Sequence, residues 1–451
     1  MAEAAPSIDL RVDPTTPRRR ISGEANKLSS DDRAAHDWYR FVLSYPPHLV
    51  RDYLSRLNGS PEKRVLDPFC GTGTTIVECK KLGVPSIGVE AHPMAHFAST
   101  TKVDWDVDPR ELEDSSRRIA AAAIDELEAS GIIDDPAPAL IAEMPDRKKL
   151  RTLAPEIEKL LLGNSISPLP LHKTLLLRDT IRTKGSERCR SHQLLALAKA
   201  LVTTIGNLEF GPEVGVGPAK ADAPVVSRWL RLIQEMADDL RTLKQLASVP
   251  SHVHHADSRD IAKLVGAESI DIVITSPPYP NEKDYTRTTR LETVLLGFIT
   301  SKKELQALKR TMVRSNTRGV YKGDADHHLV ADHAEIQRIA EAIEARRIEL
   351  GKTSGFERLY AKVTKLYFGG MARHLADLRQ VLRPNAQLAY VVGDQASYLR
   401  IMIRTGQILA SIASGLGYEV VSIDLFRTRL ATATREQLRE EVVVLRWPGH
   451  K

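Results

Sequence analysis

The amino-acid sequence predicts an α/β fold built on a mostly parallel sheet, and three observations support this class. The apolar, β-branched run 270–274 ends abruptly in Thr275–Tyr279, as expected of a buried parallel strand that opens into a loop. Residues 64–81 have the form strand, glycine-rich turn and helix, with Gly71 and Gly73 permitting close backbone approach. A short apolar strand then ends in an acid, Glu90. A glycine turn followed by an acid about twenty residues on is typical of nucleotide-like ligand binding.

The loop Ser276-Pro277-Pro278-Tyr279 is where we expect the chemistry. Two prolines in series fix φ at both positions and remove two backbone donors. The carbonyls of Ser276 and Pro277 are therefore held as acceptors, and Tyr279 is held at a set angle. Such a loop suits a planar amino group, although a strand that simply ends at a proline shows the same pattern.

Two segments together carry a family resemblance. Asp67–Thr75 and Thr275–Tyr279 resemble the motifs of S-adenosylmethionine-dependent DNA amino-methyltransferases, and the Ser-Pro-Pro-Tyr form is similar to their cytosine-N4 branch. The resemblance extends to Phe41–Val50 and Asp257–Asp260. It implies a Rossmann-like class I methyltransferase sheet, mostly parallel with an antiparallel last strand, and S-adenosylmethionine as the methyl donor.

The resemblance also implies roles for individual residues. Asp67 would hold the methionine ammonium of the cofactor, Glu90 the ribose, and Asp257 the exocyclic amine of the adenine. The other residues expected to bind the cofactor are Tyr45, Phe69, Cys70, Gly71, Gly73, Thr74, Ala91 and Ser258. Two alternatives stay open, because Glu90 could be a surface acid and Asp257 could cap the helix that follows it.

The loop Ser276–Tyr279, which we call the target loop, has the groups that methylation of an amine requires. An exocyclic amine is a poor nucleophile, because its lone pair is conjugated into the ring. The Ser276 hydroxyl and the Pro277 carbonyl can polarise its N–H bonds for attack on the methyl sulfonium, and Tyr279 can stack on the base. The target must leave the duplex to reach the loop, so we expect duplex DNA with a flipped base. Carbon-5 methylation is disfavoured, because it needs a thiolate where Tyr279 follows Pro278.

Composition narrows the class of protein. The chain has 451 residues and a net charge of +6, which fits a nucleic-acid partner without requiring one. Three cysteines show neither metal-binding spacing nor a disulfide framework, so we expect no metal and a reducing, cytoplasmic location. The sequence has no apolar run of about 18 residues and no signal peptide, so we expect no membrane association.

The pattern of elements predicts a catalytic core that two insertions interrupt. The two C-terminal strands are joined without a confident crossover helix, so they are expected to pair antiparallel. Within the first insertion, residues 173–190 are interpreted as a basic stretch between helices and residues 210–218 as a shaped turn. The expected parts are a flexible basic arm (1–30), a catalytic domain (31–105, 251–300 and 356–451), a mainly helical insertion (106–250) and a basic insertion (301–355).

Basic residues outside the motifs indicate contacts with nucleic acid. Arg314, Arg318 and Lys322 lie among small polar residues in the second insertion, and Arg287 follows the target loop. Either insertion could read the DNA sequence, and we expect both to touch DNA.

Three functions are compatible with the sequence. The first is a DNA cytosine-N4 methyltransferase of a restriction-modification or related defence system, with a possible cognate endonuclease. The second is methylation of adenine N6 in DNA or of a base amine in RNA, and Ser276 disfavours it because adenine enzymes more often have Asp or Asn there. The third is an inactive nucleic-acid-binding module, which the intact motifs disfavour.

Overall fold

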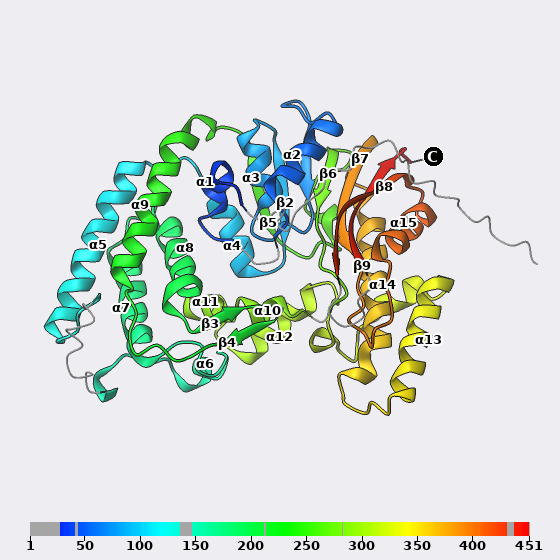
Figure 1. The fold of residues 1–451 in the computed structure, drawn as a ribbon. Coiled ribbons are helices and arrows are strands. Elements are labelled where there is room, and N and C mark those ends of the chain that lie inside the picture. The colour runs from blue at the N-terminus through cyan, green and yellow to red at the C-terminus, as the bar shows by residue number, and fades with distance from the viewer. Residues whose placement is uncertain are drawn as a thin grey trace, which may run out of the picture.

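The computed structural model describes residues 28–40, 44–135, 147–211, 213–281, 283–430 and 437–450. Their larger sheet has seven strands in the order β5-β2-β1-β6-β7-β9-β8, with helices packed around it (Figure 1). The strands are β1 Val65–Asp67, β2 Ser86–Glu90, β5 Ser251–His255, β6 Ile270–Thr275, β7 Leu382–Gly393, β8 Glu419–Leu430 and β9 Gln437–Trp447. Neighbours from β5 to β7 are parallel, whereas β9 is antiparallel to β7 and β8. The predicted α/β, Rossmann-like fold is confirmed.

Both faces of the sheet are buried, because alternate side chains of its central strands point to opposite sides. Val65 and Ile272 pack with Leu49 of α2 on one face. Leu66 and Val273 pack on the other face with residues of α14 and α15. The helices nearest the sheet are α2 Pro47–Arg56, α3 Thr74–Lys81, α4 Pro93–Lys102, α14 Tyr360–Leu378 and α15 Thr405–Gly415.

Parallel pairing brings the three sequence motifs to one edge of the sheet. Val65 of β1 pairs with Ser86 of β2 on one side and with Ile272 of β6 on the other. The glycine turn follows β1, Glu90 ends β2 and the target loop follows β6. Because the carboxyl ends of parallel strands share an edge, these segments meet although they are far apart in the sequence.

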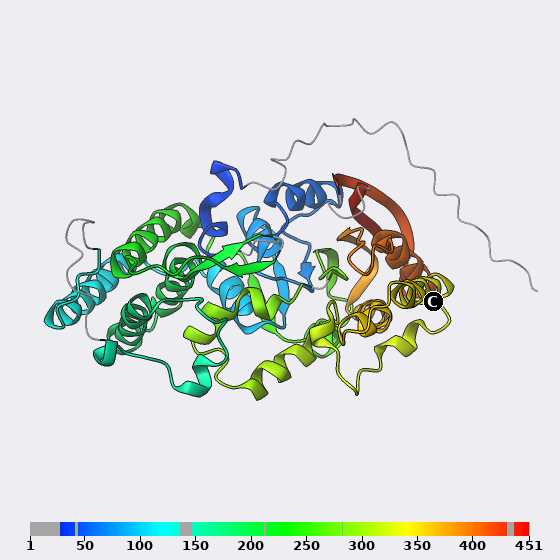
Figure 2. The ribbon, with the colours of Figure 1, turned by 60° about the horizontal axis from the view of Figure 1, so that its bottom comes forward.

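The first insertion is mainly helical and stands to one side of the sheet, from cyan to green in Figures 1 and 2. Helix α5 packs against α7 and α9, and α8 joins this group to α4. Its longer elements are α5 Pro109–Ala129, α6 Pro155–Glu158, α7 Pro168–Lys184, α8 Arg190–Ala200 and α9 Val226–Leu243, with a hairpin of β3 Leu208–Phe210 and β4 Val214–Val216. Three short helices, η3 Arg147–Lys149, η4 Leu201–Ile205 and η5 Lys244–Leu246, complete it.

The interpretation of residues 173–190 as a stretch between helices was wrong for most of its length. Residues 173–184 belong to helix α7, because the leucines of its middle turns are buried in the helical core. Lys173 is buried as well and donates to Asp222 and to the carbonyls of Ile133 and Asp134, so its charge is used inside the protein. The segment 210–218 does contain a turn, which is that of the β3–β4 hairpin, and it also contains strand β4.

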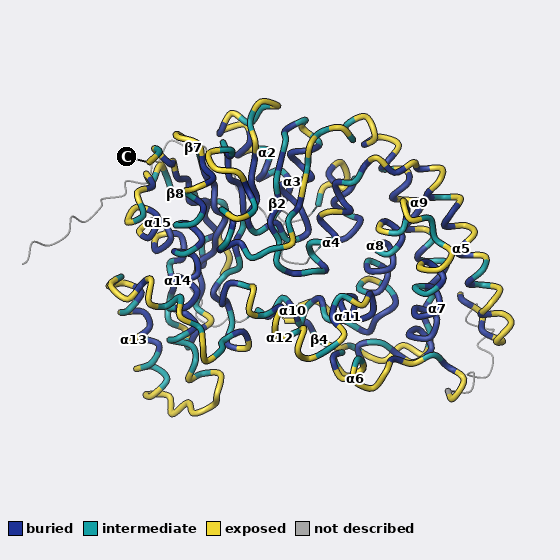
Figure 3. Tube along the Cα trace, turned by 180° about the vertical axis from the view of Figure 1, so that it is seen from behind, coloured by how far each residue is buried: buried dark blue, intermediate teal, exposed yellow. Residues whose placement is uncertain are grey.

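The second insertion lies between the target loop and α14. Its helices are α12 Lys302–Thr311, η7 Thr317–Gly319, η8 Asp326–Val330, α13 Ala334–Glu349 and η9 Glu357–Leu359. Two short helices, α10 Tyr285–Thr288 and α11 Arg290–Leu295, link it to the target loop. Figure 3 shows the sheet strands mainly in the dark blue of buried residues, with yellow, exposed chain at the outer end of α13.

The N-terminal segment begins with η1 Ser30–Asp32 and α1 Arg33–His36. Most of the arm predicted for residues 1–30 lies outside the described residues. In the part of the chain that the structure describes, no helix combines the length and apolar character that crossing a membrane requires. A short helix of the core, η6 Ile261–Lys263, follows β5.

Candidate functional site

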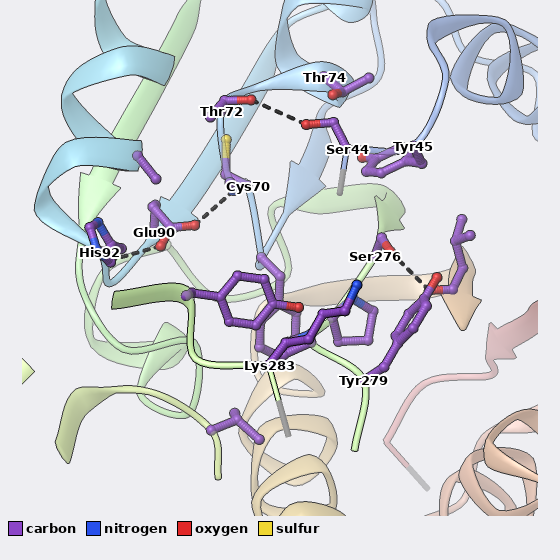
Figure 4. A pocket seen from close by; sticks show the side chains of 18 of the residues that line it. Ser44, Tyr45, Cys70, Thr72, Thr74, Glu90, His92, Ser276, Tyr279 and Lys283 are labelled. Atoms are coloured by element: carbon purple, nitrogen blue, oxygen red, sulfur yellow. Dashed lines mark hydrogen bonds between the residues drawn. The ribbon is translucent and has the colours of Figure 1, made fainter. Parts of the chain in front are cut away.

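A single cavity of about 340 Å³ joins the three motifs at the carboxyl edge of the sheet (Figure 4). All four residues predicted for the target loop line it: Ser276, Pro277, Pro278 and Tyr279. Eight of the residues predicted to bind cofactor also line it: Tyr45, Phe69, Cys70, Gly71, Thr74, Glu90, Ala91 and Ser258. The remaining three, Asp67, Gly73 and Asp257, are not part of its wall.

The two glycines of the turn have different tasks. Gly71 has a φ of +53°, and a Cβ atom there would meet nothing within 4 Å. The space beside Gly71 is therefore open to a ligand. Gly73 has a φ of +89°, but a Cβ atom there would lie 3.1 Å from Cβ of Ser99. Gly73 thus allows α4 to pack closely against the turn.

Glu90 ends β2 beside the turn and accepts two backbone hydrogen bonds. Its Oε2 accepts from N of Gly71 at 2.7 Å, and its Oε1 accepts from N of His92 at 2.7 Å. Burial raises the pKa of the Glu90 carboxyl to about 7, against the lowering effect of these amides. A carboxylate oxygen has two lone pairs, so each oxygen retains capacity for a ligand hydroxyl.

His92 connects the end of β2 to the segment after the target loop. Its Nδ1 accepts from N of Met94 at 3.2 Å, so the ring proton is on Nε2 and donates to Oγ1 of Thr289 at 3.0 Å. Burial lowers the pKa of His92 to about 4, which agrees with a neutral ring. Thr289 in turn donates to the carbonyl of Tyr285, and both residues line the cavity.

Asp67 is buried behind the cavity wall, and its carboxylate is occupied by protein donors. Its Oδ1 accepts from Oγ1 of Thr275 at 2.6 Å and from N of Phe69 at 3.2 Å, and its Oδ2 accepts from the Tyr45 hydroxyl at 3.2 Å. Burial raises the pKa of Asp67 to about 6. Asp67 therefore joins the end of β6 to the glycine turn. Tyr45, rather than Asp67, lines the cavity at this point.

Asp257 is also bound internally, whereas its neighbour Ser258 reaches the cavity. Both carboxylate oxygens of Asp257 accept from the Arg259 guanidinium, which also pairs with Asp326 at 2.6 Å. The side chain of Asp257 caps the turn at Arg259 N, while η6 starts only after Asp260. The carbonyl of Ser258 is held by His374 Nδ1 at 2.8 Å.

A hydrogen bond anchors the target loop to strand β7. The Ser276 hydroxyl donates to the carbonyl of Val391 at 3.1 Å. A Cβ atom on Gly393 would lie 3.0 Å from the Tyr279 ring, so Gly393 provides the space in which that ring stands. Burial raises the pKa of Tyr279, which therefore stays protonated at neutral pH.

Charged residues that the motifs did not indicate complete the target side of the cavity. They are Lys283, Arg427, Arg429 and Glu440. Glu440 of β9 pairs with Gly393 of β7 on one side and with Arg427 of β8 on the other, so the C-terminal hairpin delivers it to the Tyr279 ring. Strand pairing brings Arg427, Arg429 and Glu440 to the site, so no local sequence signal marks these three positions, whereas Lys283 follows the target loop in the sequence.

The four basic residues predicted to contact nucleic acid lie outside the cavity wall. Arg314 is only 6% exposed and donates to Asp324 and to backbone carbonyls, including that of Lys309, so it stabilises its own segment. The guanidinium of Arg318 lies 5.7 Å from the ring centroid of Phe356, and Lys322 is exposed. Arg287 approaches the carbonyl of Val214 at 3.5 Å, at the β3–β4 hairpin.

Comparison with known proteins agrees with this geometry. Residues 21–99 match a family model described as DNA methylase. The chain is 23% identical to the Type II methyltransferase M.BsoBI of Geobacillus stearothermophilus, over 95% of this chain and 86% of that protein. It is 24% identical to the Type II methyltransferase M.AvaI of Nostoc sp., over 97% and 91% respectively. These findings support a DNA methyltransferase.

Among the residues that the structure describes, no group of three or more His, Cys, Asp or Glu side chains could hold a metal ion. The three cysteines are free and buried. Cys70 sits in the glycine turn, where burial raises its thiol pKa, and a Cβ atom on Gly88 would lie 2.7 Å from its Sγ. Cys70 is therefore a small packing residue at the cofactor side, not an activated nucleophile.

Proposed function

We propose that the protein transfers a methyl group from S-adenosylmethionine to the exocyclic N4 amine of a cytosine flipped out of duplex DNA. The observation that carries this proposal is the continuity of the cavity, in which Gly71 and Glu90 share one space with Ser276 and Pro277. A donor held at the glycine turn and an amine held at the loop would meet without leaving the protein.

The residues around the glycine turn fit S-adenosylmethionine. The open space at Gly71 admits a ligand against the backbone, and Glu90 offers free acceptor capacity for ribose hydroxyls. Phe69 and the Ser258 segment supply the wall for an adenine ring, and Tyr45 faces the methionine side. When bound, the cofactor supplies a methyl group made electrophilic by its sulfonium.

The target loop performs the orienting step. The Ser276 hydroxyl and the Pro277 carbonyl accept hydrogen bonds from the amine, which draws its lone pair out of conjugation and aims it into the cavity. Pro278 keeps the loop rigid, and Tyr279 stacks on the base. Stacking on an aromatic wall contributes roughly 1 to 3 kcal/mol, which offsets part of the cost of flipping.

We place this reaction in restriction-modification, because the matched relatives are named Type II methyltransferases. A cognate restriction endonuclease that cuts the same site is then the expected partner. The second insertion supplies Thr311, Met312 and Val313 to the cavity wall, and the β3–β4 hairpin of the first insertion approaches Arg287. Both insertions are the proposed source of sequence recognition. Arg287, Arg318 and Lys322 are proposed phosphate contacts, whereas Arg314 acts inside its segment.

The test is to incubate the protein with tritiated S-adenosylmethionine and separate pools of duplex DNA and structured RNA, and then to identify the labelled nucleoside after digestion. We expect N4-methylcytosine from DNA, and loss of the label with Ser276→Ala although this variant still binds the cofactor. Label on N6-methyladenine or on an RNA base would change the acceptor. Cofactor binding without transfer to any pool would favour an inactive binding module.

A further inference from the structure

Lys283 follows the target loop and has a backbone fixed on both sides. Its N–H donates to Oδ1 of Asn281 at 3.3 Å, and its carbonyl accepts from Nδ2 of Asn316 at 3.1 Å. The next residue, Asp284, caps α10 and pairs with Lys309 at 2.7 Å. This support aims the Lys283 side chain into the cavity, where Figure 4 shows it extending toward the side occupied by Ser276 and Tyr279.

The Lys283 ammonium has no carboxylate within ion-pair distance among the residues that the structure describes. Glu440, the acid on the same wall, is bound by Arg427 at 2.5 Å and approached by Arg429 at 3.9 Å. Glu213 of the β3–β4 hairpin acts on Lys283 only through longer-range attraction. Burial and the nearby Arg429 lower the pKa of Lys283. A partly buried cation with free donors calls for an acceptor from the ligand.

The donor at Lys283 complements the acceptors of the target loop. Ser276 and Pro277 accept hydrogen bonds, whereas Lys283 can only donate. Cytosine and adenine present an amine donor beside a ring-nitrogen acceptor on their Watson–Crick edge, and this order matches the protein groups. Thymine and guanine present a carbonyl acceptor beside a ring N–H donor. In the same position their carbonyl would face the acceptors Ser276 and Pro277, and their N–H would face the donor Lys283.

We propose that Lys283 reads the target base by donating a hydrogen bond to the ring nitrogen beside the methylated amine, which is N3 of a cytosine. This inference rests on the proposed function, and it adds a residue that selects the base. Arg429, whose side chain is 47% exposed at the rim, is better placed than Lys283 for a backbone phosphate. The base edge is therefore the acceptor assigned to Lys283, whose side chain lies on the wall with the Tyr279 ring.

The test pairs a protein variant with a modified base. Lys283→Met removes the donor at similar volume, and 3-deazacytosine replaces N3 by C–H while keeping the amine. With unmodified DNA that contains the site which the protein methylates, we expect Lys283→Met to lower kcat/KM by roughly 10- to 100-fold. The wild type should lose a similar factor on the 3-deazacytosine oligonucleotide, and the variant should lose nothing further on it. If adenine is the methylated base, 1-deazaadenine serves the same purpose.

Controls separate this role from a structural one. Lys263→Met changes an exposed lysine of η6 and should leave all rates unchanged. Lys283→Gln keeps an N–H donor and should recover part of the activity on natural DNA. If Lys283→Met lost a further factor in kcat/KM on the 3-deazacytosine oligonucleotide, so that the two losses multiplied, the proposal would be overturned and a phosphate contact would be indicated. Absence of transfer by the wild type to unmodified DNA would instead overturn the proposed function, and this inference with it.

Discussion

Glu292 of α11 makes the stability of the protein dependent on pH in a way that can be measured. Its side chain is 1% exposed, and its Oε1 accepts from the Tyr39 hydroxyl. Its Oε2 has no hydrogen-bond partner among the described residues. Burial raises the pKa of this carboxyl from 4.5 to about 7. We therefore expect Glu292→Gln, which keeps the acceptor for Tyr39 but cannot ionise, to gain stability relative to wild type as pH rises.

The size of the effect follows from the two pKa values of Glu292. Below about pH 4.5 the folded and unfolded chains both hold the proton, and the wild type has its full stability. Between about 4.5 and 7 the unfolded chain releases the proton first, so wild-type stability falls, and the loss is complete above about pH 7. A difference of 2.5 between 7 and 4.5, at about 1.4 kcal/mol per pH unit, gives about 3 kcal/mol.

Urea unfolding between pH 5 and pH 8 measures this difference. Asp67 and Glu90 also titrate in this range, but they are present in both proteins and cancel in the comparison. Glu341→Gln, at an exposed position of α13, is the matched control and should run parallel to wild type. A constant gap between wild type and Glu292→Gln at every pH would refute the assignment of a buried, neutral carboxyl.

Three further predictions concern the site. Gly393→Ala should displace the Tyr279 ring and lower kcat about tenfold, with cofactor affinity unchanged. The control Gly163→Ala, which places its methyl group in open space, should have no effect. A kcat of Gly393→Ala equal to that of the wild type would contradict the packing argument. Glu90→Gln should weaken S-adenosylmethionine binding at least about tenfold by calorimetry, and unchanged affinity would remove Glu90 from the cofactor site. Arg314→Met should lower the free energy of unfolding by about 2 kcal/mol, because the part-buried Asp324 loses its guanidinium partner and keeps the hydrogen bond from the Tyr321 N–H, yet DNA affinity in fluorescence anisotropy should not change. Weaker DNA binding at full stability would restore Arg314 as a phosphate contact.

Local patterns in the sequence were sufficient to place the motifs. Runs of β-branched residues marked the central strands, and a glycine turn or a proline pair marked where two of them end. Because parallel strands share an edge, Gly71, Glu90 and Ser276 could be expected at one site from the sequence alone. The antiparallel hairpin of β8 and β9 was also predictable, since no crossover helix separates them.

Features that depend on distant partners were not predictable. Lys173 looked like part of a basic surface, but Asp222 and two carbonyls accept its ammonium inside the helical core. Asp67 looked open to a ligand, but its partner Thr275 comes from the neighbouring strand. Arg314 looked free to contact phosphate, but Asp324 lies beside it in the fold. Lys173 and Asp67 are thus paired by residues far away in the sequence, whereas the partner of Arg314 lies in the same segment and meets it only once that segment folds back on itself.

The buried links around the cavity indicate which parts can move when DNA enters. Asp67 joins the glycine turn to β6 through Thr275, and His92 joins the end of β2 to α10 and α11 through Thr289. Such buried bonds hold the glycine turn and the target loop at a fixed separation, which the in-line transfer that we propose would require. The β3–β4 hairpin approaches the target side through a long contact, Arg287 to Val214 at 3.5 Å, and through the attraction between Glu213 and Lys283. If the proposed function holds, we expect this hairpin to adjust when DNA binds and the segments joined by the buried bonds to keep their positions.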